Sequence, residues 1–196
     1  MKRIMCASAF FIVLVLGTFV CALGGPLPDT GQTKCYDNSV EITCPQPGED
    51  FYGQDGSYLI NPPSYTKLDA EGNDLPDSAI VWFMVRDNVT GLIWEAKRND
   101  GSIHDKDNLY TWQNAQDVFI AQVNGEKFGG HSDWRMPTPK EFQSIANLGN
   151  IGPSVNTTFF PKCRSSYNYW SGSTNAHYSD DAWDVEFRRR RREQRQ

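Results

Sequence analysis

The order of apolar and polar positions divides the chain into a leader, an irregular segment and a region with regular elements. Residues 4–20 are almost wholly apolar and follow the basic start Met1-Lys2-Arg3. Small residues come next, so the pattern predicts a secretory signal peptide over residues 1–22, cleaved after Ala22. The alternatives are a retained membrane anchor, for which about 17 apolar residues lie at the low edge of spanning length, and a lipid on Cys21.

Residues 23–78 have no helical periodicity and are rich in Pro, Gly and Asp. This composition predicts an irregular arm, for which two interpretations stay open. The arm is either ordered, with its aromatic side chains packed on another surface, or a flexible stalk. The aromatic residues concerned are Tyr36, Phe51, Tyr52 and Tyr58.

Regular elements are expected from Ala79 onward. The β-branched and aromatic run that begins at Ile80, the turn residues 88–91 and the run LIWEAK predict a β-hairpin over residues 80–97. Thr111 is a candidate N-cap, and the apolar positions after it have helical spacing up to Asn124-Gly125.

A second helix is predicted by Thr138, Pro139 and Glu141, which fit an N-cap, the first helical position and the partner in a capping box. This helix is expected to run to Gly149. Two short aromatic strands, YNYWSGSTN and DAWDVEF, follow. The order hairpin, helix, helix, strands predicts an α+β fold with long loops.

Charge is distributed unevenly along the chain. Residues 26–187 contain 23 Asp and Glu against 11 Lys and Arg, a balance of 11 − 23 = −12, whereas the whole chain carries −5. The difference comes from the leader and from the basic segment at residues 188–196. An acidic domain disfavours nucleic-acid binding, because phosphate contacts need clustered cations.

Three cysteines follow the leader. Cys35 and Cys44 lie nine residues apart in the arm, and in an exported protein they are expected to form a disulfide. Closing this loop stabilises by about 2–3 kcal/mol in the chain-entropy account. Cys163 is then free, paired between chains, or paired with one of the other two. The three histidines are isolated in sequence, so we expect no metal site and no cofactor.

Several blocks of the chain resemble one bacterial family, the Lcl C-terminal domain family. The matching blocks are VRDNVTGLIWE (85–95), YTWQNAQ (110–116), FGGHSDWRMPTPKEFQSI (128–145), FFP (159–161), YWSGSTN (169–175) and AWDVEF (182–187). The arm resembles the segment that often precedes such domains. The resemblance implies a C-type-lectin-like fold, two helices packed on a small antiparallel sheet, in a secreted or surface protein.

The chain departs from the family pattern in two ways. The family domain normally continues past the AWxVxF block through a further hairpin, whereas here Phe187 is followed by RRRRREQRQ. We interpret this as a truncation or frameshift, so the domain is expected to be incomplete over residues 79–187, with a basic tail at 188–196. The calcium and sugar signatures of true C-type lectins are also absent.

Candidate binding residues are found in the loops of the resembling blocks. The name-giving adhesin of the family binds sulfated polysaccharides, and indole rings and guanidinium groups are the side chains that stack on sugars or grip sulfate. The candidates are Asp133, Trp134, Arg135, Trp170 and Asn175. For the six tryptophans as a group, burial in the core is the favoured interpretation, and Trp134 and Trp170, which lie beside loops, are the candidate exceptions. His104, Asp105, Asp107 and Asn108 form an acidic loop that we expect to be solvated.

These observations predict an exported binding module that recognises a glycan, a sulfated polysaccharide or another surface protein. Export would place it in the periplasm, on the outer surface or outside the cell, with the membrane contacted only through an uncleaved leader. The alternatives are a structural domain that pairs with a partner protein and an enzyme that uses Cys163. No catalytic motif supports the enzyme.

Overall fold

The computed structural model describes residues 12–13, 26–178 and 181–188. Its main sheet has five strands in the order β1-β7-β6-β4-β5. These strands are β1 (Ile12–Val13), β7 (Ile93–Glu95), β6 (Met84–Asp87), β4 (Tyr65–Leu68) and β5 (Asp74–Leu75). Every strand pair in this sheet is antiparallel.

The predicted hairpin is present but shorter than expected. Strands β6 and β7 pair in the register Val85 opposite Trp94. Ile80 does not belong to a strand and is 91% exposed. Just before β6, the backbone N–H of Phe83 donates to the carbonyl of Leu68 at 2.9 Å, so this residue is bonded to a neighbouring segment of the sheet.

The sheet begins within the segment that we expected to be irregular. Strand β4 pairs with β6 from Tyr65 opposite Asp87 to Leu68 opposite Met84. The structural domain therefore starts near Tyr65, not at Ala79. The sequence hid this strand because pairing with β6 and β5 extends it, while Pro62-Pro63 and a run of turn formers flank it.

A continuous helical stretch follows the hairpin. It consists of α1 (Trp112–Asn114), the π-helical η2 (Ala115–Ile120) and α2 (Ala121–Gly125). Thr111 caps it as predicted, with its side chain accepting from the backbone N–H of Asn114. A short 3₁₀ turn, η3 (Phe128–Gly130), leads into the next loop.

The second helix, α3 (Pro139–Ser144), begins as predicted with the complete capping box of Thr138 and Glu141. It ends before Gly149 because two backbone donors in the stretch expected to be helical have tertiary partners. The N–H of Asn147 donates to Ser154 O at 2.9 Å, and the N–H of Leu148 donates to Thr30 O at 2.8 Å.

A two-stranded antiparallel sheet closes the domain. Strands β8 (Asn168–Thr174) and β9 (Ala182–Glu186) correspond to the two predicted aromatic strands, and their register shifts between Trp170 and Thr174. Together with the helices, the two sheets confirm the α+β class. Within the described residues, no helix is long and apolar enough to span a membrane.

Two apolar clusters fill the space between these elements. The first lies under the helical stretch and contains Phe119, Trp134 and Trp170. The second lies under α3 and contains Trp94, Phe142 and Tyr169. Of residues 26–64, none belongs to either cluster.

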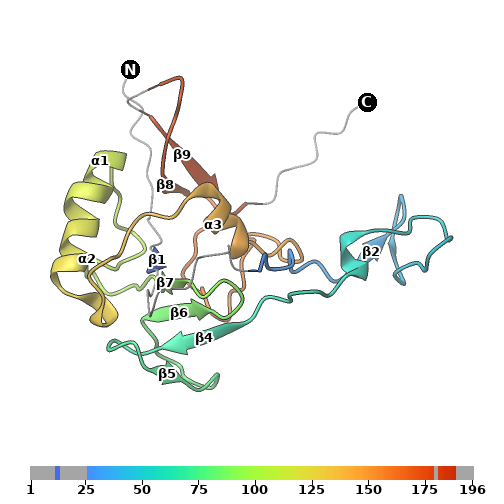
Figure 1. Cartoon of the computed structure of the whole chain (residues 1–196), viewed down its shortest axis with the longest axis horizontal. Helices are drawn as coiled ribbons and strands as arrows, with labels where there is room; N and C mark the ends of the chain where they lie inside the picture. Colours follow the sequence, from blue (N-terminus) through green and yellow to red (C-terminus); the bar gives the residue numbers. More distant parts are fainter. Residues whose placement is uncertain (1–11, 14–25, 179–180, 189–196) are drawn as a thin grey trace.

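Residues 26–64, which are called the arm from here on, project from this body (Figure 1). The arm contains a small hairpin, β2 (Cys35–Tyr36) with β3 (Glu41–Ile42), and a 3₁₀ turn, η1 (Asp55–Ser57). The predicted disulfide between Cys35 and Cys44 is confirmed, and Cys163 is free and buried. Apart from β1, the predicted signal peptide lies outside the described residues, as does most of the basic segment.

Candidate functional site

A groove opens where the helical stretch, the loop before α3 and β8 meet. Its volume is about 460 Å³. Gln116 and Ile120 come from the π-helical turn, and Gly172 comes from β8. The loop supplies the remaining lining residues, Arg135, Met136 and Thr138.

Arg135 is fixed at the groove by a two-point ion pair with the first turn of α3. Its Nη2 lies 2.7 Å from Glu141 Oε1 and its Nη1 lies 3.0 Å from Glu141 Oε2. The side chain of Arg135 is nevertheless 42% exposed. A paired guanidinium that keeps donors open to solvent can bind an uncharged oxygen of a ligand without bringing excess charge to it.

The carboxylate of Glu141 takes part in both the ion pair with Arg135 and the capping box of α3. Besides Arg135, its Oε2 accepts the backbone N–H of Thr138 at 2.7 Å, while Thr138 Oγ1 accepts the N–H of Glu141 at 3.2 Å. Burial alone acts to raise the pKa of Glu141, but the hydrogen bonds from Arg135 and Thr138 outweigh it and keep that pKa below its usual range. The carboxylate is therefore ionised near neutral pH.

Hydrogen bonds to backbone carbonyls fix β8 to the loop before α3 and to the helical stretch. The N–H of Gly172 donates to Pro137 O at 2.8 Å, and the indole N–H of Trp112 donates to Ser171 O at 2.9 Å. A Cβ on Gly172 would lie 3.2 Å from Met136 O, so glycine permits this close approach. The three elements that line the groove are therefore joined to one another by hydrogen bonds.

Of the five predicted binding residues, only Arg135 lines the groove. Asp133 is exposed and acts electrostatically on Arg135, whose pKa is raised mainly by its hydrogen bond to Glu141. Asn175 lies after β8, where its Oδ1 accepts from the backbone N–H of His177 at 3.0 Å. It therefore shapes the connection between β8 and β9.

Trp134 and Trp170, chosen as the exceptions that could stack on a ligand, follow instead the core interpretation favoured for the tryptophans as a group. Both are core residues, 2% and 5% exposed. Their indole N–H groups donate to Phe128 O at 2.8 Å and to Tyr110 O at 3.0 Å. Indole burial supplies much of the core in a domain with so few regular elements, which explains this outcome.

The exposed indole belongs to Trp183, on β9, which is 58% exposed. We did not select this residue from the sequence. Period-two alternation in the AWDVEF block could have indicated it, since Ala182 is buried and its neighbour must face the other side of the strand.

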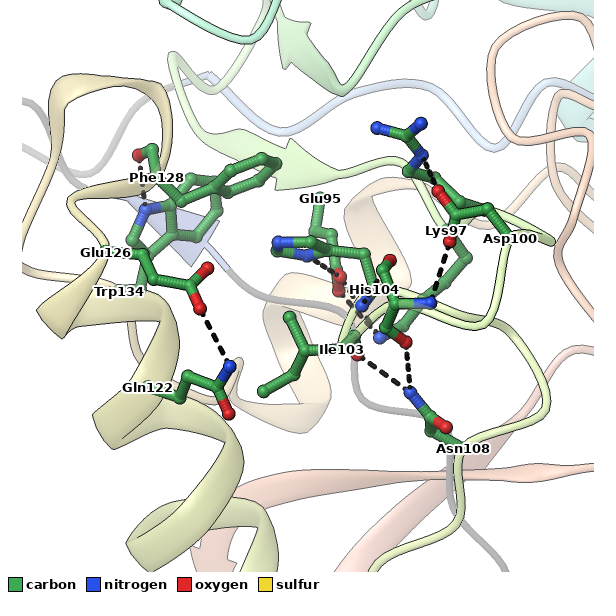
Figure 2. Close-up of polar contacts among 12 residues, drawn as sticks. Glu95, Lys97, Asp100, Ile103, His104, Asn108, Gln122, Glu126, Phe128 and Trp134 are labelled. Atoms are coloured by element: carbon green, nitrogen blue, oxygen red, sulfur yellow. Dashed lines mark hydrogen bonds and ion pairs between the residues drawn. The ribbon is translucent and has the colours of Figure 1, made fainter.

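A second feature missed from the sequence is a buried charged cluster under the helical stretch (Figure 2). Glu95 Oε1 lies 2.7 Å from His104 Nδ1 and 3.1 Å from Lys97 Nζ, and Glu95 Oε2 lies 2.9 Å from the same Nζ. The side chains of Glu95 and Lys97 are 1% and 2% exposed. Burial lowers the pKa of Lys97, and the charge of Glu95 opposes that effect.

Aromatic rings enclose this cluster. Lys97 Nζ lies 4.4 Å from the ring centroid of Phe119, and the His104 ring stacks on Phe128 at 4.3 Å. The cluster therefore ties strand β7, the following loop, the helix and η3 together, and it has a structural role. Its sequence signal is that Ile93, Glu95 and Lys97 alternate along one extended run, so the two charged residues share the face of a core residue.

The other predicted candidates for chemistry have structural surroundings. Burial raises the pKa of the Cys163 thiol to about 12, which keeps it protonated at neutral pH, when it is a poor nucleophile. Asp105 is buried, not solvated as expected, because its carboxylate closes its own loop by accepting the N–H groups of Asp100, Gly101 and Asp107. Among the described residues, no three His, Cys, Asp or Glu side chains gather into a metal-binding group.

The fold and groove define an α+β domain with a single polar guanidinium fixed at an open surface site. The sequence profile of the Lcl C-terminal domain matches residues 83–196, which is more than half of the chain. The chain therefore belongs to the Lcl C-terminal domain family, as its motifs predicted. No curated protein and no solved structure matches it, so the lectin-like topology stays a prediction.

Proposed function

We propose that this protein is an exported binding module that holds a neutral glycan in the groove beside Arg135. The observation that carries the proposal is the composition of the groove. It combines the amide of Gln116, the hydroxyl of Thr138 and the guanidinium of Arg135 with the apolar side chain of Ile120. Sugars present hydroxyl groups at the edge of the ring and C–H groups on its faces, so they need both kinds of surface.

The local backbone adds support. Gln116 and Ile120 lie in the π-helical turn, a rare distortion that is found frequently at functional sites. Here the distortion lies within a helix that is otherwise α-helical at both ends.

The charge of the protein favours a neutral ligand over an anionic one. Glu141 already balances Arg135, and the body from residue 26 to residue 187 carries 11 − 23 = −12. A sulfated polysaccharide would approach this surface against a repulsive field. We therefore favour an uncharged glycan over a polyanionic one.

A glycan array on the mature protein tests the proposal, followed by titration of the strongest neutral hit. Gln116→Ala is expected to weaken binding about three- to tenfold, the effect of one lost hydrogen bond. Gln113→Ala, on the exposed face of the same helical stretch, is the matched control and should bind as the unchanged protein does. Preferential binding of sulfated glycans, no binding at all, or equal affinity for both variants would contradict the proposal.

A further inference from the structure

The arm displays a group of aromatic side chains that the core does not use. Tyr36, Phe51, Tyr52 and Tyr58 are between 42% and 46% exposed. The sequence led us to expect, as one interpretation, that these rings pack on another surface. They are instead exposed to solvent on the arm, which contains the Cys35–Cys44 disulfide and projects from the domain (Figure 1).

Hydrogen bonds connect the parts of the arm that carry these aromatic side chains. The amide of Gln54 accepts the N–H of Tyr36 at 2.9 Å and donates to Tyr36 O at 2.8 Å and to Phe51 O at 3.0 Å. The phenol groups of Tyr52 and Tyr58 are hydrogen-bonded to each other, which raises the pKa of Tyr58. The rings are therefore displayed by an ordered scaffold.

Phe51 has a backbone conformation that a bulky residue seldom adopts. Its φ is +63°, in the left-handed region. A non-glycine residue there is strained, and such strain clusters at binding and switch sites. The strain at Phe51 places an apolar ring at the surface, where it contributes no buried area to the core.

The arm is also acidic. Residues 26–64 contain six Asp and Glu and one lysine, Lys34, a balance of 1 − 6 = −5. Lys34 is itself paired with Glu41, with Nζ 2.6 Å from Oε2. Exposed rings in a negative field bind guanidinium groups well, because a guanidinium stacks on aromatic faces and is weakly hydrated.

The chain contains a matching segment. Residues 188–196 hold six arginines and one glutamate. Their starting point is close to the base of the arm, since Phe187 O accepts from Ser154 N, Ser154 O accepts from Asn147 N, and the adjacent Leu148 N donates to Thr30 O. The eight residues after Arg188 can span up to about 27 Å when extended.

We propose that the aromatic face of the arm, defined by Tyr36, Phe51, Tyr52 and Tyr58, binds the arginine-rich segment 188–196 of the same chain. Charge complementarity and the short connection favour this occupant, because a tethered segment meets the arm at high effective concentration. The inference is independent of the glycan groove, which the arm does not line.

Trypsin protection tests this proposal in the full chain. Mass spectrometry would follow the rate of cleavage after residues 188–192 at low ionic strength. Phe51→Gly combined with Tyr52→Ala is expected to raise that rate about tenfold, the effect of losing two cation–π contacts. Glycine at position 51 suits the positive φ, so the arm should keep its fold.

Trp183→Ala removes an exposed ring outside the arm and is the matched control. Protection in the Trp183→Ala variant equal to that of the unchanged chain supports the proposal. Equal cleavage rates in the arm variant and the unchanged chain would overturn it. Dilution separates binding within one chain from binding between chains. Protection that is independent of protein concentration supports the proposal, and protection that disappears on dilution contradicts it.

Discussion

Glu95 shows what one side chain can organise in this domain. Its carboxylate contacts both Lys97 and His104 in a region enclosed by aromatic rings. Replacing a buried ion pair with apolar groups is often tolerated, whereas removing one partner leaves a charge without compensation in a low dielectric. The cluster therefore makes the junction of β7 with the helical stretch sensitive to single substitutions.

Glu95→Gln is expected to lower the free energy of unfolding by about 3–5 kcal/mol, because it leaves the Lys97 charge buried beside a neutral amide. Urea denaturation would measure the loss. Glu41→Gln removes one partner of a solvent-exposed pair and should cost far less than Glu95→Gln. Adding Lys97→Met to Glu95→Gln should recover part of the stability. A Glu95→Gln cost no larger than that of Glu41→Gln would refute the structural role of the cluster.

At the scale of elements, local chemistry decided where both helices begin, and tertiary contacts decided where α3 ends. The capping box at Thr138 and the N-cap at Thr111 were readable because each depends on residues within one turn. The end of α3 was not readable, because the backbone donors of Asn147 and Leu148 bond to Ser154 and to Thr30 in the arm.

Thr138→Ala is expected to destabilise the domain by about 1 kcal/mol, since it removes the side-chain acceptor at the start of α3. Thermal or urea unfolding would report the loss. Thr138→Ser should retain most of the stability, and Thr33→Ala, at an exposed position in the arm, should be nearly neutral. If Thr138→Ala and Thr138→Ser are equally stable, the hydroxyl does not cap the helix as described.

At the scale of the whole molecule, the arm and the domain are energetically separable. The disulfide and the β2–β3 hairpin stabilise the arm, while the two apolar clusters contain none of its residues 26–64. The two parts meet through a few backbone bonds, such as Leu148 N to Thr30 O.

Replacing Cys35 and Cys44 together with serine is therefore expected to destabilise the arm by about 2–3 kcal/mol while leaving the domain folded. Hydrogen exchange would show faster exchange of the Asp37 amide, which donates to Val40 O within the arm, and unchanged exchange of the Asp87 amide, which donates to Leu92 O in the domain. Loss of protection at both amides would show that the two parts unfold together.

The sequence by itself determined the α+β class, the family, the disulfide and the helix starts. Each of these depends on neighbouring residues or on blocks with a fixed order. Only the tertiary structure decided that Trp134 and Trp170 are buried, that β4 joins the sheet from within the expected arm, and that Gln116 and Gly172 share a groove with Arg135. These outcomes depend on contacts between residues far apart in the chain, and a period along the sequence carries no information on which distant surface covers a given side chain.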